Sequence, residues 1–167
     1  LAAAVAMEAG WQCALMAPTE ILAEQHFRKL VSWLEPLGIR VAWLTGSLKS
    51  KVKKAQLEAV ATGEAQLVVG THAVIQDQVE FKKLGLALID EQHRFGVAQR
   101  LQLRRKLESS ELEPHLLMMS ATPIPRTLAM TYLADLDVST IDELPPGRTP
   151  IVTKVFGDAR RPEVVER

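Results

Sequence analysis

The stretch Leu86-Ala87-Leu88-Ile89-Asp90-Glu91-Gln92-His93 is the most informative part of this 167-residue chain. An apolar run that ends in two adjacent carboxylates is typical of a buried parallel strand. In open α/β sheets, ligands bind at the carboxyl ends of the strands, so Asp90 and Glu91 are expected where Mg²⁺ and a phosphate chain can reach them. The same pattern also occurs without a catalytic role, so the rest of the chain has to decide between the two interpretations.

Similar apolar runs recur along the chain, with helical patterns between them. They lack polar alternation, which predicts strands covered by helices on both faces of a mostly parallel sheet. Helical spacing predicts helices over Glu20 to Leu34 and Lys51 to Val60. The βα repeat therefore predicts an α/β fold. The five runs are Cys13 to Ala17, Val41 to Leu44, Leu67 to Val69, Leu86 to Ile89 and Leu116 to Met119.

The composition excludes disordered and fibrous classes, because 47% of the residues are hydrophobic and 24% are charged. Twenty basic and twenty acidic side chains give a net charge of zero, so nucleic-acid binding would have to come from local clusters. Cys13 is the only cysteine, which excludes a disulfide within the chain and a metal held by several cysteines. Its apolar neighbours predict a buried thiol in a reducing compartment.

The character of the sequence changes after Tyr132. Residues 145–150, with the sequence Pro-Pro-Gly-Arg-Thr-Pro, are predicted to be a linker, because consecutive prolines lack the amide donors of a helix or a sheet. We therefore place a first domain at 1–144, the interdomain linker at 145–150 and the start of a second domain at 151–167. Ile151 to Phe156 alternates like a strand. The acidic residues between 135 and 143 are interpreted as solvated loop carboxylates rather than as a metal site.

Each apolar run ends in small or polar residues, so the five ends are expected to form one surface. Helix capping remains an alternative for each Ser or Thr taken singly. Thr45-Gly46-Ser47 precedes four lysines between 49 and 54, a pattern that suits the phosphates of a nucleic-acid backbone. A solvated helix face is the alternative for these lysines. Gly70-Thr71-His72 offers a second backbone contact, although His72 could equally be a structural hydrogen bonder.

No G-x-x-x-x-G-K-[ST] phosphate loop occurs, because none of the nine glycines is followed by lysine. Leu1 to Gly10 reads as a helix without a capping residue, in the place where the helix after such a loop should lie. We therefore expect the chain to be a fragment.

Taken in order, these motifs resemble a superfamily 2 helicase motor, and more closely the bacterial RecG-type ATP-dependent DNA helicases. Asp90 to Gly96 resembles motif II, and Met119 to Thr127 resembles motif III with its extension; both are long and specific. Residues 17–26 resemble motif Ia, 44–47 motif Ib and 70–73 the next DNA-facing motif. The resemblance implies a RecA-like P-loop NTPase three-layer fold, truncated at its N-terminus, with the arginine finger of a second motor domain beyond the linker.

The resemblance also implies roles for individual residues. Asp90 would help to hold Mg²⁺ through its water shell, and Glu91 would polarise the attacking water as general base. Four residues would couple the nucleotide state to the rest of the motor: Gln92, His93, Ser120 and Thr122. The DNA track would be lined by Pro18, Thr19, Thr45, Gly46, Ser47, Gly70, Thr71 and Arg126.

The implied parent protein uses ATP and Mg²⁺ to remodel branched double-stranded DNA, such as stalled forks and Holliday junctions, in recombination and repair. Single-stranded-DNA-binding protein is an implied further partner, no membrane is involved, and the parent is expected to be a monomer in the bacterial cytoplasm. The isolated fragment is expected to be inactive. Two alternatives stay open: a transcription-repair coupling factor, which typically carries a second Glu where this chain has Gln92, and a non-enzymatic DNA-binding or interaction module with the same fold.

Overall fold

The computed structural model describes residues 1–91, 94–95, 114–121, 137–143, 145–149 and 151–157. The chain forms two compact units, Leu1–Ile124 and Pro125–Arg167. The described residues of the second unit form no helix or strand. No helix in the described part of the chain is long and apolar enough to cross a membrane.

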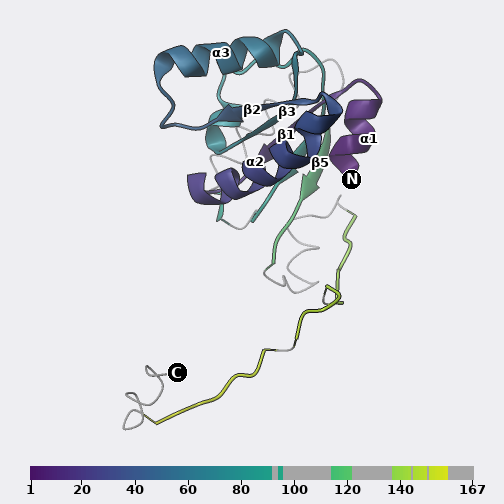
Figure 1. Ribbon diagram of the computed structural model, residues 1–167, viewed down its shortest axis with the longest axis vertical. Coiled ribbons are helices and arrows are strands. Elements are labelled where there is room, and N and C mark those ends of the chain that lie inside the picture. The colour runs from purple at the N-terminus through teal and green to yellow at the C-terminus, as the bar shows by residue number, and fades with distance from the viewer. Residues whose placement is uncertain (92–93, 96–113, 122–136, 144, 150, 158–167) are drawn as a thin grey trace. The chain divides into compact units, whose positions relative to one another are not determined.

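A five-stranded sheet forms the centre of the first unit (Figure 1). All four pairings between neighbouring strands are parallel, and the strand order is β2-β3-β1-β4-β5. Each strand begins and ends within two residues of an apolar run that the sequence predicts, so the predicted α/β fold is confirmed. The strands are β1 (Gln12–Met16), β2 (Arg40–Leu44), β3 (Ala65–Gly70), β4 (Leu84–Ile89) and β5 (His115–Met118).

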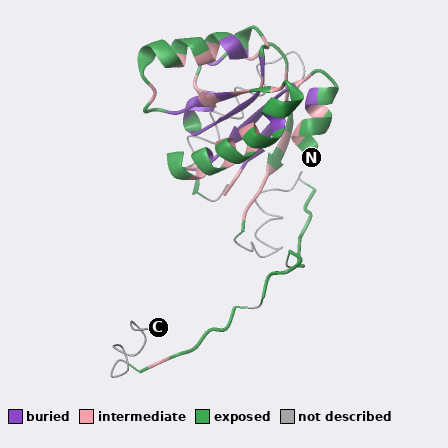
Figure 2. Cartoon of the chain, in the orientation of Figure 1, coloured by how far each residue is buried: buried purple, intermediate pink, exposed green. Residues whose placement is uncertain are grey.

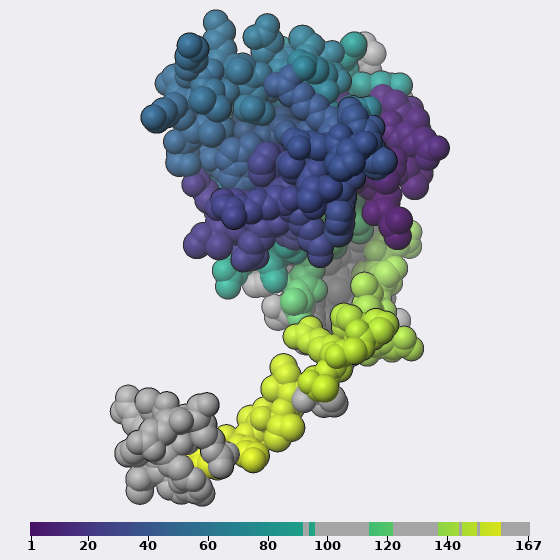
Figure 3. All heavy atoms as spheres, viewed as in Figure 1, coloured from purple at the N-terminus to yellow at the C-terminus, as the bar shows by residue number. Residues whose placement is uncertain are grey.

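Helices cover both faces of this sheet. Helices α1 (Ala2–Glu8) and α2 (Glu20–Leu34) pack against one face, whereas α3 (Ser50–Ala61) packs against the other. Two short 3-10 helices, η1 (Glu35–Leu37) and η2 (His72–Ile75), follow α2 and β3. In the space-filling view, α1 and α2 form much of the near surface, in purple and dark blue (Figure 3).

The sheet is buried on both faces because successive side chains of a strand point to opposite sides. On β1, Cys13 and Leu15 pack with α1 and α2, whereas Ala14 and Met16 belong to the cluster on the α3 side. Strand β4 alternates in the same way, with Leu86 and Leu88 toward the face that α1 and α2 cover. Figure 2 shows these buried strands between helices with exposed outer faces. Double burial explains why the strands read as continuous apolar runs.

Helix α2 begins and ends at the predicted residues, for local reasons. Thr19 is its N-cap, and the Thr19 hydroxyl oxygen accepts a hydrogen bond from the Leu22 amide at 3.3 Å. Ala23, Phe27, Leu30 and Leu34 recur at helical spacing and pack against the sheet. This stripe fixes the helix over β2 and β3.

The strand predicted over Ile151 to Phe156 is wrong, because residues 151–157 have no regular secondary structure. A strand needs a neighbour to bond its backbone groups, and no described strand pairs with this segment. Its apolar residues Ile151, Val152 and Val155 are exposed instead. Before it, residues 145–149 are exposed and contain a turn in which the Arg148 amide donates to the Pro145 carbonyl at 3.1 Å. The boundaries of the predicted domains and linker stay predictions.

Candidate functional site

The carboxyl ends of the five strands lie in one row. Leu44 pairs with Gly70, Gly70 with Met16, Met16 with Ile89, and Ile89 with Met118. Beyond this row, the Asp90 amide donates to the Met16 carbonyl at 2.9 Å, and the Met119 amide donates to the Ile89 carbonyl at 2.8 Å. The residues that follow the strands therefore share one edge of the sheet, as the sequence predicts.

Asp90 has hydrogen-bond partners for both of its carboxylate oxygens. Oδ2 lies 2.7 Å from Nε2 of His26 on α2, and Oδ1 accepts from the Glu91 amide at 2.9 Å. Asp90 follows Ile89 in the alternation of β4, so it points toward the face that α2 covers, as Leu88 does. The carboxylate is thereby held in one orientation at the carboxyl edge of the sheet.

Glu91 has a backbone φ of 49° and is the one non-glycine residue with positive φ in the described part of the chain. This left-handed conformation costs roughly 1–2 kcal/mol for a residue with a Cβ atom. The Glu91 carbonyl accepts a hydrogen bond from the Arg94 amide at 2.9 Å. Strain of this kind collects at functional sites, so the conformation itself supports a functional role for Glu91.

Of the residues predicted to couple the nucleotide state, the structure describes only Ser120. It is half-buried and lies two residues after Met118, whereas Glu91 lies two residues after the paired Ile89 on the neighbouring strand. Ser120 and Glu91 therefore occupy equivalent positions just beyond the ends of the adjacent strands β5 and β4. Three further predicted residues, Gln92, His93 and Thr122, lie outside the described residues, as does the predicted DNA contact Arg126.

The residues predicted to line a DNA track fall into two groups. The first group reaches the surface, with Pro18 half-buried and the other members exposed: Pro18, Thr19, Gly46 and Ser47. The second group is buried and cannot contact DNA directly without a local change: Thr45, Gly70 and Thr71. Thr45 Oγ1 lies 3.2 Å from Ser47 Oγ, so the buried hydroxyl can orient the exposed one.

Glu20 holds the loop that contains Ser47. Its carboxylate accepts from the Ser47 hydroxyl at 2.8 Å and from the Ser47 amide at 3.3 Å. Helix α3 begins only at Ser50, so Ser47 lies before the helix and its amide is already engaged. Sequence reasoning missed the roles of Glu20 and His26, although both belong to the segment that resembles motif Ia.

Gly70 has a packing reason to be glycine. A Cβ atom there would lie 1.7 Å from the carbonyl oxygen of Leu44 and 2.9 Å from a methyl carbon of Val74. At Gly46, by contrast, a Cβ atom would meet nothing within 4 Å. Of these two predicted DNA contacts, Gly70 thus has a structural requirement and Gly46 does not.

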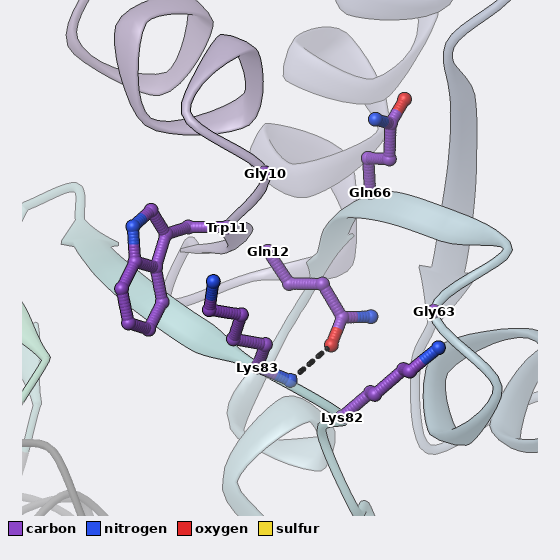
Figure 4. A pocket seen from close by; sticks show the side chains of 7 residues that line it. All are labelled: Gly10, Trp11, Gln12, Gly63, Gln66, Lys82 and Lys83. Atoms are coloured by element: carbon purple, nitrogen blue, oxygen red, sulfur yellow. Dashed lines mark hydrogen bonds between the residues drawn. The ribbon is translucent and has the colours of Figure 1, made fainter.

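A hollow of about 160 Å³ lies at the opposite, amino edge of the sheet (Figure 4). The side-chain amide of Gln12 is part of its lining. This amide donates to the carbonyls of Val60 and Ala65 at 2.8 Å each and accepts from the backbone amide of Lys83 at 2.9 Å. The Lys83 ammonium lies 4.0 Å from the centre of the Trp11 ring. The residues that line the hollow include lysines and glutamines but no carboxylate, so the hollow lacks the acid pair found at the carboxyl edge.

The donor set at Asp90 suits one kind of metal. The described residues contain no group of three side chains that could hold a metal ion by themselves. Mg²⁺ is commonly bound by one or two carboxylates together with substrate phosphates and water, and Asp90 supplies such a carboxylate. Asp90 therefore fits the part of a carboxylate that helps to hold Mg²⁺ together with the phosphates of a nucleotide.

A parallel sheet covered by helices on both faces, with an acid pair at the carboxyl end of the inner strand β4, is the arrangement found in RecA-like α/β motor domains. The chain belongs to the DEAD/DEAH box helicase family, whose model matches residues 1–131. ATP-dependent DNA helicase RecG of Haemophilus influenzae is 60% identical over the whole chain, which spans 24% of the length of that relative. The resemblance to RecG-type helicases is thus confirmed.

The solved structures that resemble the chain include the following two. One, described as RecG bound to a three-way DNA junction, is 41% identical with a TM-score of 0.74, and the match covers 94% of this chain and 20% of that one. The other, the C-terminal domain of the DEAD-box protein Dbp5, is 9% identical with a TM-score of 0.55 over 76% of this chain and 72% of that one. The second likeness supports the RecA-like fold alone.

Proposed function

We propose that the chain is most of the first motor domain of an ATP-dependent DNA helicase that remodels branched DNA. The observation that carries this proposal is the acid pair at the carboxyl end of β4, with Asp90 held on both oxygens and Glu91 in a left-handed conformation. The motor would lie in a longer protein, and the 167-residue chain by itself is expected to be inactive.

In this proposal Asp90 and Glu91 divide the chemistry of ATP hydrolysis. Asp90 orients the water shell of Mg²⁺, which when bound neutralises charge on the phosphates. Glu91 accepts a proton from the attacking water as general base. Ser120 lies just beyond the end of β5, at the position equivalent to that of Glu91 beyond β4. This position supports its predicted role in sensing the nucleotide. Gln92, His93 and Thr122 are proposed for the same role on resemblance alone.

The DNA track would run over the loops that precede α2 and α3. Exposed Thr19, Gly46 and Ser47 offer small and hydroxyl-bearing groups that suit phosphate contacts. The buried Thr45, Gly70 and Thr71 would act by shaping these loops. Branched DNA is the proposed substrate because the RecG structure that resembles this chain is bound to a three-way junction.

The remaining expectations rest on the relatives. ATP use agrees with the name of the RecG relatives as ATP-dependent helicases. A single-stranded-DNA-binding partner, a monomeric parent and a cytoplasmic location are proposed on resemblance alone. The comparisons do not favour a transcription-repair coupling factor or a non-enzymatic module.

A junction-remodelling assay with the intact protein tests the proposal. We expect conversion of a labelled three-way junction into separated arms with ATP, and none with a non-hydrolysable ATP analogue. Glu91→Gln should abolish conversion, whereas Glu8→Gln, at an exposed position on α1, should not. Binding of the junction without conversion would favour a non-enzymatic module, and conversion only with RNA polymerase would favour a coupling factor.

A further inference from the structure

A histidine from a distant element contacts the predicted metal carboxylate. His26 precedes Asp90 by 64 residues, and its Nε2 lies 2.7 Å from Asp90 Oδ2, at the short end of the hydrogen-bond range. Their side chains are 35% and 23% exposed, so the pair is partly withdrawn from water. A hydrogen bond in such surroundings constrains a side chain more than one at the open surface.

The position of His26 is fixed by the packing of α2. His26 lies three residues after Ala23 and four before Leu30, at the border of the stripe that packs against the sheet. Next to it, the Phe27 ring lies 5.0 Å from the Trp43 ring of β2, measured between centroids. The imidazole is therefore placed by a packed helix, while the Glu91 amide holds the other oxygen of Asp90.

We propose that His26 is a positioning residue, which donates its Nε2 hydrogen to Asp90 and holds that carboxylate in the orientation that serves the Mg²⁺–nucleotide complex. The inference rests on the proposed function. Mg²⁺ demands nearly ideal octahedral geometry, so a carboxylate that rotates freely binds its water shell poorly. Groups that orient metal ligands typically contribute about 10- to 100-fold to metal affinity or activity.

Helix α2 thereby contacts two predicted sites at once. Glu20 is its first residue and holds Ser47, whereas His26 is its seventh and holds Asp90. Seven residues make about two helical turns. One short rigid segment thus connects the predicted DNA-facing loop with the predicted metal carboxylate.

The test measures metal binding by the intact protein, with Mn²⁺ as a spectroscopic substitute for Mg²⁺ and ADP present. Free Mn²⁺ is followed by electron paramagnetic resonance. We expect His26→Ala to raise the Kd for Mn²⁺ at least tenfold, and His26→Gln to restore most of the affinity because its amide also donates. ADP binding in the presence of a chelator should be unchanged in both variants. His115→Gln, at an exposed position near the amino edge of β5, is the matched control.

Several results would overturn the inference. One is an unchanged Kd for Mn²⁺ in His26→Ala. Another is a His26→Gln variant that binds Mn²⁺ no more tightly than His26→Ala. A third is a loss of ADP affinity in the presence of a chelator that is as large as the loss of Mn²⁺ affinity. If His26→Ala does not fold, His26→Leu replaces it, since leucine keeps bulk without a donor. Absence of Mn²⁺ binding in the unmutated protein with ADP would instead contradict the proposed function, and the inference would fall with it.

Discussion

Asp90 and Glu91 are adjacent in sequence but have different surroundings. Asp90 accepts hydrogen bonds on both carboxylate oxygens, which hold the carboxylate in a fixed orientation. Glu91 leaves the strand through a left-handed backbone conformation that redirects its side chain. Two neighbouring acids with distinct environments are suited to two distinct roles. Substitution of Asp90 should therefore weaken metal binding, whereas substitution of Glu91 should slow turnover.

At Glu20, removal of the charge should strengthen DNA binding. The carboxylate lies against the Ser47 amide and hydroxyl, which are donors that a DNA phosphate would use, and it would repel that phosphate. In the intact protein, Glu20→Gln keeps an acceptor for Ser47 but loses the charge. We expect its Kd for branched DNA to fall about threefold at low salt, with the difference shrinking as salt is raised.

Glu24→Gln is the matched control, because Glu24 lies one turn further along α2 and pairs with exposed Arg28. Fluorescence anisotropy with labelled junction DNA gives both affinities. Weaker binding by Glu20→Gln than by the control would show that Glu20 serves only to order the loop.

The Cys13 thiol should be unreactive in the folded chain. Cys13 is fully buried, and burial raises the pKa of its thiol from the ordinary 9.0 to about 11. At pH 8 only about 0.1% of the thiol would then be thiolate, the form that reacts with iodoacetamide. Mass spectrometry should find alkylation only after denaturant is added. The same shift predicts that the free energy of unfolding falls as pH rises from 9 to 11, because the thiol ionises first in the unfolded chain.

Alkylation of the native chain at the rate of a free cysteine would contradict the predicted burial. The sequence alone predicted that burial correctly, because Cys13 lies within an apolar run. The contacts of His26 and Glu20 could not be predicted in the same way. Each contact depends on how α2 crosses the sheet, and local sequence patterns do not predict that crossing.

Among the strands, β3 should be the most sensitive to a single added methyl group. Gly70→Ala places a Cβ atom 1.7 Å from the Leu44 carbonyl oxygen, so β2 and β3 must separate or distort. We expect a loss of about 3 kcal/mol or more in the free energy of unfolding. Gly46→Ala is the control, since a Cβ atom there has open space. Urea denaturation of the two variants should differ clearly, and equal stabilities would refute the close approach of the strands.

An element can be predicted from the sequence when the residues that determine it lie within the element itself. Helix α2 was predicted to the residue because its cap at Thr19 and its apolar stripe are both local. The five strands were predicted because burial on both faces makes them apolar throughout. The strand expected at Ile151 to Phe156 was wrong, since alternation alone does not supply a neighbouring strand. The left-handed conformation of Glu91 carries no local signal, because glutamate gives no hint of positive φ.

At the scale of the molecule, the chain has no net charge, so its proposed DNA contacts must be local. The two edges of the sheet differ in chemistry. The carboxyl edge gathers the acid pair with exposed hydroxyl and glycine residues, whereas the amino edge has a hollow lined by lysines, glutamines and Trp11. The sequence predicted the parallel sheet and the gathering of the strand ends at one edge, whose function stays a prediction. It did not give the strand order, which brings β4 beside β1 and thereby Asp90 within reach of α2.

The most direct test of the central claim compares ATP binding and ATP hydrolysis in the intact protein and its Glu91→Gln variant, with and without branched DNA. If Glu91 is the general base, the variant should bind ATP as tightly as the unmutated protein. Its rate in a single-turnover experiment should fall about 10²- to 10⁴-fold. Hydrolysis at the unmutated rate by Glu91→Gln, with DNA stimulation intact, would contradict the assignment of the acid pair on which the proposed motor function rests.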